Sequence, residues 1–475
     1  MSDPNWTSVL PPVLAIVLAI VTRQVYLSLG AGIWLGWMIV SGWNPLVGLA
    51  AAIEGVVAVF GDAGNTRVLL FTLVIGALIA TVEASGGVRG FVSYLEQRDW
   101  VNTPRRARLL AYIVGIIIFI ESNITCLVSG AVARPVFDRY RISREKLAYL
   151  IDATSAAVCI LIPLNAWGAH VLGILNTLDV DRPLDVFIAS IPFNFYALVT
   201  VLLAGIVAVT GWEIGPMRKA QRRTREGQIL WPGATPMIDS DIIAPPSETS
   251  IPPRARNMFL PIAAMVVTMP LALLITAYMS TGAWDLRRGS GSTSVLWAVL
   301  TGLAVAWVML LAQRAFTVDR LVRIGLRGAG GLVSLALVLL LALALADVTK
   351  ELGTGRYIAR LAEETLAPAV LLPLVFLVAA VTGFCTGTSW GTFAIMLPIA
   401  VPAAAALELP IAPFVAAVLS GGVFGDHASP ISDTTIISSM AAATDHIDHV
   451  RTQLPYALIG GALAVLGFTL VGALA

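Results

Sequence analysis

Long stretches of apolar, almost uncharged residues recur along the whole chain, separated by short polar loops. Runs of about 18 or more such residues are as long as a helix must be to cross about 30 Å of hydrocarbon. We therefore expect an all-α polytopic membrane protein. The pattern predicts apolar membrane segments at residues 8–22, 24–42, 68–86, 109–133, 147–175, 186–211, 258–280, 294–312, 328–347, 366–407, 411–444 and 454–475.

The composition agrees with a membrane protein and argues against several other classes. Of the 475 residues, 57% are hydrophobic and 12% are charged, whereas soluble proteins carry about 25% charged residues. The net charge of +1 predicts no nucleic-acid partner. The cysteines are isolated, so neither a disulfide nor a cysteine metal site is expected. No Walker A, GxSxG or dinucleotide motif occurs, which argues against an enzyme and against ATP-driven transport.

Lysine and arginine residues predict the topology, because short basic loops stay on the cytoplasmic side. They concentrate in residues 88–108, 134–146, 212–256 and 313–327. Segment 109–133 has basic loops on both sides, so we expect a re-entrant hairpin that enters and leaves from the cytoplasm, with its tip near 121–125. A single span with one basic loop outside is the alternative.

The second half of the chain weakly repeats the first. Pro163 aligns with Pro430 and Pro192 with Pro455, at offsets of 267 and 263 residues. We expect two inverted-topology repeats, each with about five transmembrane helices, one re-entrant hairpin and a helix broken at the midplane, as in many secondary transporters. The predicted parts are a first repeat at 1–211 with its hairpin at 109–133, a cytoplasmic polar linker at 212–257, and a second repeat at 258–475 with its hairpin at 366–407.

Polar residues gather where each hairpin tip is expected to meet a proline-broken helix. Oxygen atoms of such side chains and of unwound backbone are suitable ligands for Na⁺. For any single serine or threonine, a hydrogen bond to its own helix backbone is the alternative. The predicted cation- and proton-binding residues are Asp433, Asp426, His427, Ser429, Ser432, Thr386, Thr388 and Ser389 in the second half, and Glu121, Ser122, Asn123, Thr125 and Asn165 in the first.

Carboxylates inside a membrane are costly and functional by default. An unoccupied carboxylate in a low-dielectric site favours its protonated form, so a cation that binds there would release a proton. This competition at Asp426 and Asp433 is the simplest route to cation/proton exchange. Asp152 closely follows a basic loop, so a structural pairing with Lys146 or Arg144 is expected, and a functional role is the alternative.

The four histidines predict different roles. His446 and His449 stand three residues apart beside Asp445 and Asp448, but no third convergent ligand is near, so we expect no structural zinc. A solvated loop at the cytoplasmic mouth is expected there, with a pH-responsive element as the alternative. His427 beside Asp426 is a candidate for proton handling, and His170 is expected to be structural.

Two stretches resemble a known family. "GGVFGDHASPISDTTIISS" followed by "TDHIDHVRTQLPYAL" is similar to the signature of NhaC-type sodium/proton antiporters of the ion transporter superfamily, and "RPVFDRYRISREKLAYLIDATSAAVCILIPLNAWGA" is similar to the matching part of the first half. The resemblance implies an inverted-repeat transporter, often a homodimer, in a bacterial plasma membrane. It also implies functional roles for Asp426, His427, Ser429, Ser432, Asp433 and Thr434. It departs at the first hairpin, where many members carry Asp-Asp-Tyr-Phe-Asn and this chain reads "ESNIT".

The sequence thus predicts a sodium/proton antiporter that works by alternating access, without a cofactor, since Na⁺ and the proton are the transported species. The alternative is a sodium- or proton-coupled carrier or exchanger of a small organic anion, such as a dicarboxylate or lactate, or of an amino acid. The bilayer, and a second copy of the chain in a homodimer, are the other expected partners.

Overall fold

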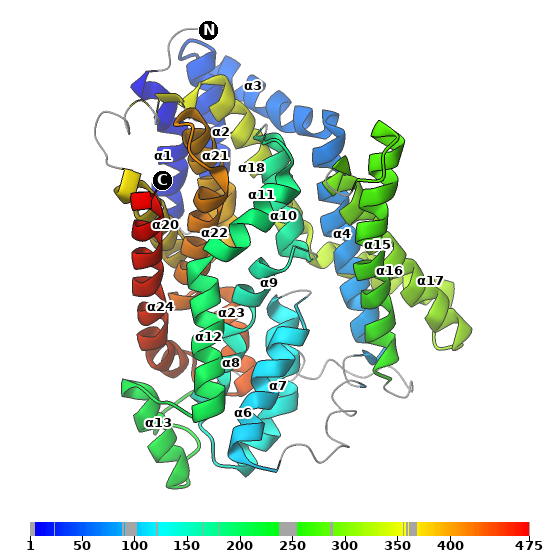
Figure 1. Cartoon of the computed structure of the whole chain (residues 1–475), viewed down its shortest axis with the longest axis vertical. Coiled ribbons are helices and arrows are strands. Elements are labelled where there is room, and N and C mark those ends of the chain that lie inside the picture. The colour runs from blue at the N-terminus through cyan, green and yellow to red at the C-terminus, as the bar shows by residue number, and fades with distance from the viewer. Residues whose placement is uncertain are drawn as a thin grey trace.

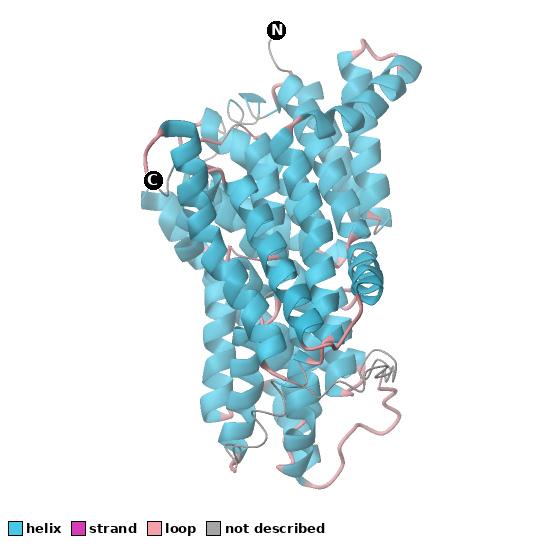
Figure 2. Cartoon of the chain, turned by 90° about the vertical axis from the view of Figure 1, so that its right-hand side faces the viewer, coloured by secondary structure: helices cyan, strands magenta, loops and turns pink. Residues whose placement is uncertain are grey.

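The chain folds into helices that run mostly along one axis (Figure 2). The computed structural model describes residues 5–22, 24–87, 90, 102–119, 122–163, 165–178, 180–236, 254–285, 288–354, 356–357, 360 and 368–474. Within these ranges, eight helices are long and apolar enough to cross a membrane, or up to eleven spans if each bent pair counts as one. The predicted class, an all-α polytopic membrane protein, is confirmed.

The first half opens with a short helix, two packed helices and a helix that turns away from them. These are η1 (Trp6–Val9), α1 (Leu10–Thr22), α2 (Val25–Val40) and α3 (Pro45–Ala58), followed by η2 (Val59–Gly61) and α4 (Ala63–Ala84). The turn before α3 bends the chain by 119°, so α3 crosses the upper end of the molecule in Figure 1. The sequence pattern missed α3 and predicted a loop there, although Asn44 caps the helix and Pro45 opens it.

The segment expected to be re-entrant is a helical hairpin. It consists of α6 (Pro104–Ile117) and α7 (Ser122–Arg139), both of whose outer ends lie at the lower end of the molecule (Figure 1). The chain then rises through a broken span and returns. The broken span is α8 (Arg144–Ala153), α9 (Ala156–Leu161) and α10 (Ala166–Thr177), and the returning helices are α11 (Pro183–Ser190), η3 (Ile191–Phe193) and α12 (Phe195–Thr210).

The first described stretch of the polar linker, residues 212–236, is anchored to the first half. It contains α13 (Gly215–Arg225) at the lower end of Figure 1, which we call the α13 end. Arg223 forms a two-pronged ion pair with Glu145 of α8, at 2.8 and 3.0 Å, and both side chains are buried. Lys146 pairs with Glu213 at 2.6 Å. The sequence pattern predicted a polar linker here without a helix, so it missed α13.

The second half repeats the same kinds of element. Two packed helices lead to an amphipathic helix, a further span, a hairpin, a broken span and a final long helix. These are α15 (Arg256–Thr281), α16 (Gly291–Ala312), α17 (Val318–Gly331), α18 (Val333–Glu351), α20 (Pro368–Thr386), α21 (Ser389–Ala406), α22 (Ile411–Ala428), α23 (Asp433–Ala442) and α24 (His446–Leu474).

The two hairpins approach the middle of the molecule from opposite ends. The hairpin of α6 and α7 rises from the α13 end, while that of α20 and α21 descends from the end that carries α3 (Figure 1). The two broken spans are interrupted near Pro163 and Pro430, as the sequence predicted. This arrangement is the one expected of inverted repeats, and the inversion itself stays a prediction.

Candidate ion-binding site

The tip of the second hairpin rests directly on the break in the next span. Gly387 lies in the left-handed region with φ +66°, and a Cβ atom there would lie 2.6 Å from the Ile431 carbonyl oxygen. Only glycine fits both the turn and this close contact. Thr388 then caps α21, its hydroxyl accepting the Gly391 amide at 3.5 Å. The sharp turn thus brings the start of α21 against the residues just before and after Pro430.

Asp426 lies at the centre of this contact, in the last turn of α22, with 1% of its surface exposed. Its Oδ2 accepts hydrogen bonds from the Ser389 amide at 3.1 Å and from the Ser389 hydroxyl at 2.6 Å. Its Oδ1 has no hydrogen-bond partner among the described residues. A fully buried carboxylate with an unsatisfied oxygen is costly unless a proton or cation reaches it.

Small residues permit this burial. Gly425 of α22 packs so closely on α20 that a Cβ would lie 2.3 Å from the Ala380 carbonyl oxygen. Gly421 makes a similar approach to Phe376. The backbones of α20 and α22 therefore touch, which leaves no room for water beside Asp426 from that direction.

Asp433 occupies a different environment on the other side of the break. It is the first residue of α23 and is exposed. Its carboxylate accepts the Thr434 amide at 2.8 Å and benefits from the positive end of the helix dipole. The pair therefore combines one accessible and one buried carboxylate.

The remaining predicted residues of the second half serve mainly local structure here. Ser432 caps α23 and its hydroxyl lies 3.1 Å from that of Thr434. Ser429 donates to the Phe384 carbonyl at 2.7 Å, which ties the break to the hairpin tip. The Thr386 hydroxyl donates to the carbonyl four residues earlier, which is the alternative that the sequence predicted for a single threonine.

His427 is buried, with Nδ1 2.6 Å from the Tyr196 hydroxyl and Nε2 without a partner among the described residues.

In the first half, too, polar residues connect the hairpin tip with the break in the next span and cap helices. Asn165 donates to the Phe119 carbonyl at the hairpin tip, at 2.9 Å, and caps α10 through the Gly168 amide. Thr125 donates to the Ile118 carbonyl, and Ser122 is buried at the start of α7. Glu121 and the side chain of Asn123 lie outside the described residues.

A separate buried group of polar residues lies outside the predicted set of binding residues. Asp152 of α8 accepts hydrogen bonds from Thr435 at 3.1 Å and from Gln453 at 2.7 Å. The predicted pairing of Asp152 with Lys146 or Arg144 is wrong, because Lys146 bonds Glu213 and Arg144 bonds Asp138.

The prediction of a solvated loop at the second of the paired histidines is also wrong. His449 is completely buried in the first turns of α24, 2.8 Å from the amide oxygen of Gln453. The spacing of His449 and Gln453, four residues apart, was the available signal, since such residues share one face of a helix.

The two halves meet through aromatic side chains as well. The rings of Trp167 in α10 and Trp390 in α21 lie 4.8 Å apart, and His170 contacts the Trp390 backbone carbonyl through Nε2 at 3.2 Å. Both tips and both breaks therefore belong to one central cluster.

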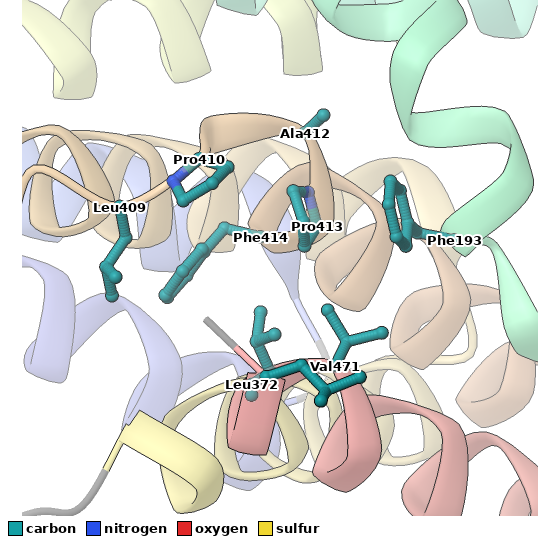
Figure 3. Close-up of a pocket in the computed structure, with 10 residues that line it drawn as sticks. Phe193, Leu372, Leu409, Pro410, Ala412, Pro413, Phe414 and Val471 are labelled. Atoms are coloured by element: carbon teal, nitrogen blue, oxygen red, sulfur yellow. The ribbon is translucent and has the colours of Figure 1, made fainter.

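An apolar pocket lies elsewhere, at the opposite end of α22. It is lined by Phe193, Leu372, Leu409, Pro410, Phe414 and Val471, among others (Figure 3). Asp426 lies fifteen residues further along α22 than Ile411, or about 22 Å at the rise of an α-helix. The pocket has no role in binding ions at the carboxylates.

Comparison with known proteins agrees with this geometry. Residues 173–473 match the family described as the Na⁺/H⁺ antiporter family, which is more than half of the chain. The chain belongs to this family. The resemblance seen in the sequence is thereby confirmed, and the protein is a multi-pass membrane transporter of the secondary antiporter type.

Individual relatives of this antiporter carry different cargoes. An uncharacterized protein of Haemophilus influenzae is 32% identical over 99% of this chain and 91% of its own length. Two local matches, each covering about a quarter of both chains, are the arginine/ornithine antiporter ArcD of Halobacterium salinarum, 34% identical over 26% of each chain, and the malate-2H⁺/Na⁺-lactate antiporter of Bacillus subtilis, 31% identical over 23% of each chain.

The antiporter also has the fold of a solved transporter. The YdaH transporter of Alcanivorax borkumensis superposes with a TM-score of 0.57, at 16% identity, over 90% of this chain and 88% of that one. At this identity the likeness concerns the fold alone.

Proposed function

We propose that the protein exchanges Na⁺ for protons across the inner membrane of a bacterium, with Na⁺ and a proton competing for Asp426. The observation that carries the proposal is the buried Asp426 carboxylate, with one oxygen held by Ser389 and the other unsatisfied among the described residues. Deprotonation exposes a charge that burial makes costly, and a bound cation offsets it. The α13 end, with its many arginines, faces the cytoplasm by the positive-inside rule.

Each residue of the site has a defined part in this exchange. Asp433, exposed and separated from Asp426 by the break, is the carboxylate that an entering cation meets first. Ser389 and the unwound backbone around Pro430 supply neutral oxygens. A movement of α20 and α21 relative to α22 would change which end of the molecule reaches Asp426, because the hydrogen bonds of Ser389 cross that contact.

The function is tested in everted membrane vesicles that hold a pH gradient. Addition of Na⁺ alone is expected to dissipate the gradient, because Na⁺ entry releases protons from the carboxylates. Vesicles from cells that lack the protein are the control. A gradient that collapses only when an organic solute accompanies Na⁺ would contradict the proposal.

That last outcome describes the second candidate function, exchange or cotransport of an organic solute. It is favoured by the local matches to an arginine/ornithine antiporter and to a malate/lactate antiporter. Arginine, ornithine, malate and lactate are therefore the solutes to add in the same assay.

Ser389 is expected to set the affinity of the site for the cation. Its hydroxyl donates to Asp426 at 2.6 Å, and hydrogen bonds to charged groups contribute about 1.5–3 kcal/mol. Ser389→Ala is expected to raise the apparent KM for Na⁺ by about 10-fold or more, because loss of this hydrogen bond favours the protonated carboxyl that competes with Na⁺. Thr382→Val is the matched control, because Thr382 is a buried hydroxyl of α20 that bonds only its own helix. Equal KM values for the two variants would contradict this role.

A further inference from the structure

A second buried polar cluster lies between α8, α23 and α24, and the proposed exchange at Asp426 does not use it. Its members form a continuous chain of hydrogen bonds that ends at a partly exposed histidine near the α13 end. Asp152, Ser439, His449 and Gln453 are each at most 2% exposed. The chain runs through Asp152, Gln453, His449, Ser439 and His446.

The amide of Gln453 has one allowed orientation. Its Nε2 lies 2.7 Å from Asp152 Oδ2 and 2.6 Å from the His427 carbonyl oxygen, and both of these atoms accept hydrogen bonds. The nitrogen must therefore face them, which turns Oε1 toward His449 at 2.8 Å from Nε2. His449 consequently carries a proton on Nε2.

The hydroxyl of Ser439 has more acceptors around it than it can satisfy. It lies 2.7 Å from the Thr435 carbonyl oxygen, 2.9 Å from His449 Nδ1 and 3.2 Å from His446 Nδ1. His446 Nε2 faces the Pro430 carbonyl at 2.6 Å and must donate to it. With both imidazoles neutral, three acceptors share one O–H group. One added proton turns an Nδ1 into a donor and relieves the conflict.

The same proton would also neutralise the buried negative charge of Asp152. Its carboxylate is buried and its Oδ1 has no partner among the described residues. The cations of the same helix, Arg144 and Lys146, are bound to Asp138 and Glu213. His449 Nε2 lies 4.0 Å from Asp152 Oδ2. An ionised Asp152 beside neutral imidazoles would leave a net negative charge in a buried site, which one shared proton removes.

Other titratable or charged groups face the cluster from the neighbouring helices. They are His427 of α22, Tyr196 of α12, the Glu145–Arg223 pair of α8 and α13, Arg144 at the Ala443 carbonyl, Asp433 at the start of α23, and Asp445, Asp448 and Arg451 around the first turns of α24. Arg144 and Arg223 are paired with Asp138 and Glu145, and Arg451 is exposed, so none of these described cations neutralises Asp152.

We propose that Asp152, His449 and His446 form a second proton-binding site, in which one dissociable proton is shared through Gln453 and Ser439 and exchanges at the His446 end. The site contacts the break in α22 and α23 through the Pro430 and His427 carbonyls. A change in its protonation therefore alters the hydrogen bonds that hold the backbone at the break. The inference goes beyond the exchange proposed at Asp426 and does not depend on which ions are transported.

The sign of its effect on stability follows from counting protons. Above pH 7 the unfolded chain has an ionised aspartate and neutral histidines, whereas the folded cluster holds one proton. The folded state binds more protons, so its stability falls as the pH rises. Asp152→Asn removes the charge that retains the proton, and this part of the pH dependence disappears with it.

Thermal unfolding of the full-length protein, purified in detergent, tests the site between pH 7 and 9. The Tm of Asp152→Asn minus that of the wild type is expected to grow over this range by about 3 °C or more. The control is Asp138→Asn, because Asp138 has its own cation partner; its difference from the wild type is expected to stay constant. Parallel curves for Asp152→Asn and the wild type would overturn the proposal.

A second variant keeps the test decisive if Asp152→Asn folds poorly. His449→Gln is expected to lower the Tm at pH 7.5, because it leaves Asp152 without its proton partner, and Asp152→Asn in the same chain is expected to restore part of the loss. Additive losses would overturn the shared proton. These measurements need no transport, so they test the second site even if the wild type fails to exchange Na⁺ for protons.

Discussion

Asp426→Asn is expected to reduce Na⁺-driven proton movement by about 100-fold or more, which corresponds to about 2.7 kcal/mol. The amide keeps the shape of the side chain, but it has no proton that dissociates and no negative charge to balance a cation. Because the wild-type carboxylate is buried with an oxygen that lacks a partner among the described residues, the variant is expected to fold at least as well as the wild type. The measurement is the initial rate of gradient collapse in everted vesicles after addition of Na⁺.

The matched control is Asp319→Asn, which removes an exposed carboxylate of α17 from a surface ion pair with Arg323. Its rate is expected to equal that of the wild type, since exposed pairs contribute little. A wild-type rate for Asp426→Asn would show that the exchange occurs elsewhere. In the same assay, an intact rate for Asp433→Asn would remove Asp433 from the site.

Arg223→Met is expected to lower the free energy of unfolding by about 3–5 kcal/mol, because it leaves the buried Glu145 carboxylate without its partner. Arg223 also donates to the Ile229 carbonyl and stacks on Trp231 at 4.7 Å, so the linker after α13 is expected to detach. Thermal unfolding of the full-length protein in detergent and proteolysis of the linker would both report the loss.

Arg222 offers a matched control one position earlier in the same helix. It pairs with Glu226 on the surface, with side chains 83% and 64% exposed, and Arg222→Met is expected to change stability by no more than about 0.5 kcal/mol. Replacing Glu145 and Arg223 together with methionine is expected to recover much of the loss. Equal losses for Arg222→Met and Arg223→Met would contradict the buried ion pair.

The features that depend on local sequence could be predicted. Apolar runs marked the long helices, basic loops on both sides of 109–133 marked the first hairpin, and Pro163 and Pro430 marked the breaks. The α3 helix was missed because its apolar stretch is too short to span a membrane. The α13 helix was missed because its polar composition looked like a linker, while its stability comes from ion pairs with α8.

The features that depend on distant contacts could not be predicted. Asp152 bonds Thr435 and Gln453, which are 283 and 301 residues away in the chain, and no local pattern reveals such partners. The sequence also treated Asp426 and Asp433 as equivalent. Their environments differ because the hairpin tip of α21 covers only Asp426, a consequence of the close packing of Gly425 and Gly387 on their neighbours.

The long separation between Asp152 and Gln453 matters for how the protein is made. Gln453 lies in α24, 301 residues after Asp152, so it is synthesised much later than α8. At about 5–20 residues per second, the carboxylate of α8 waits about 15–60 seconds for its partners after it has been synthesised. Until then the first half holds an unmatched acid in the bilayer. Newly made protein that stops short of α24 therefore displays a defect that membrane quality control can recognise.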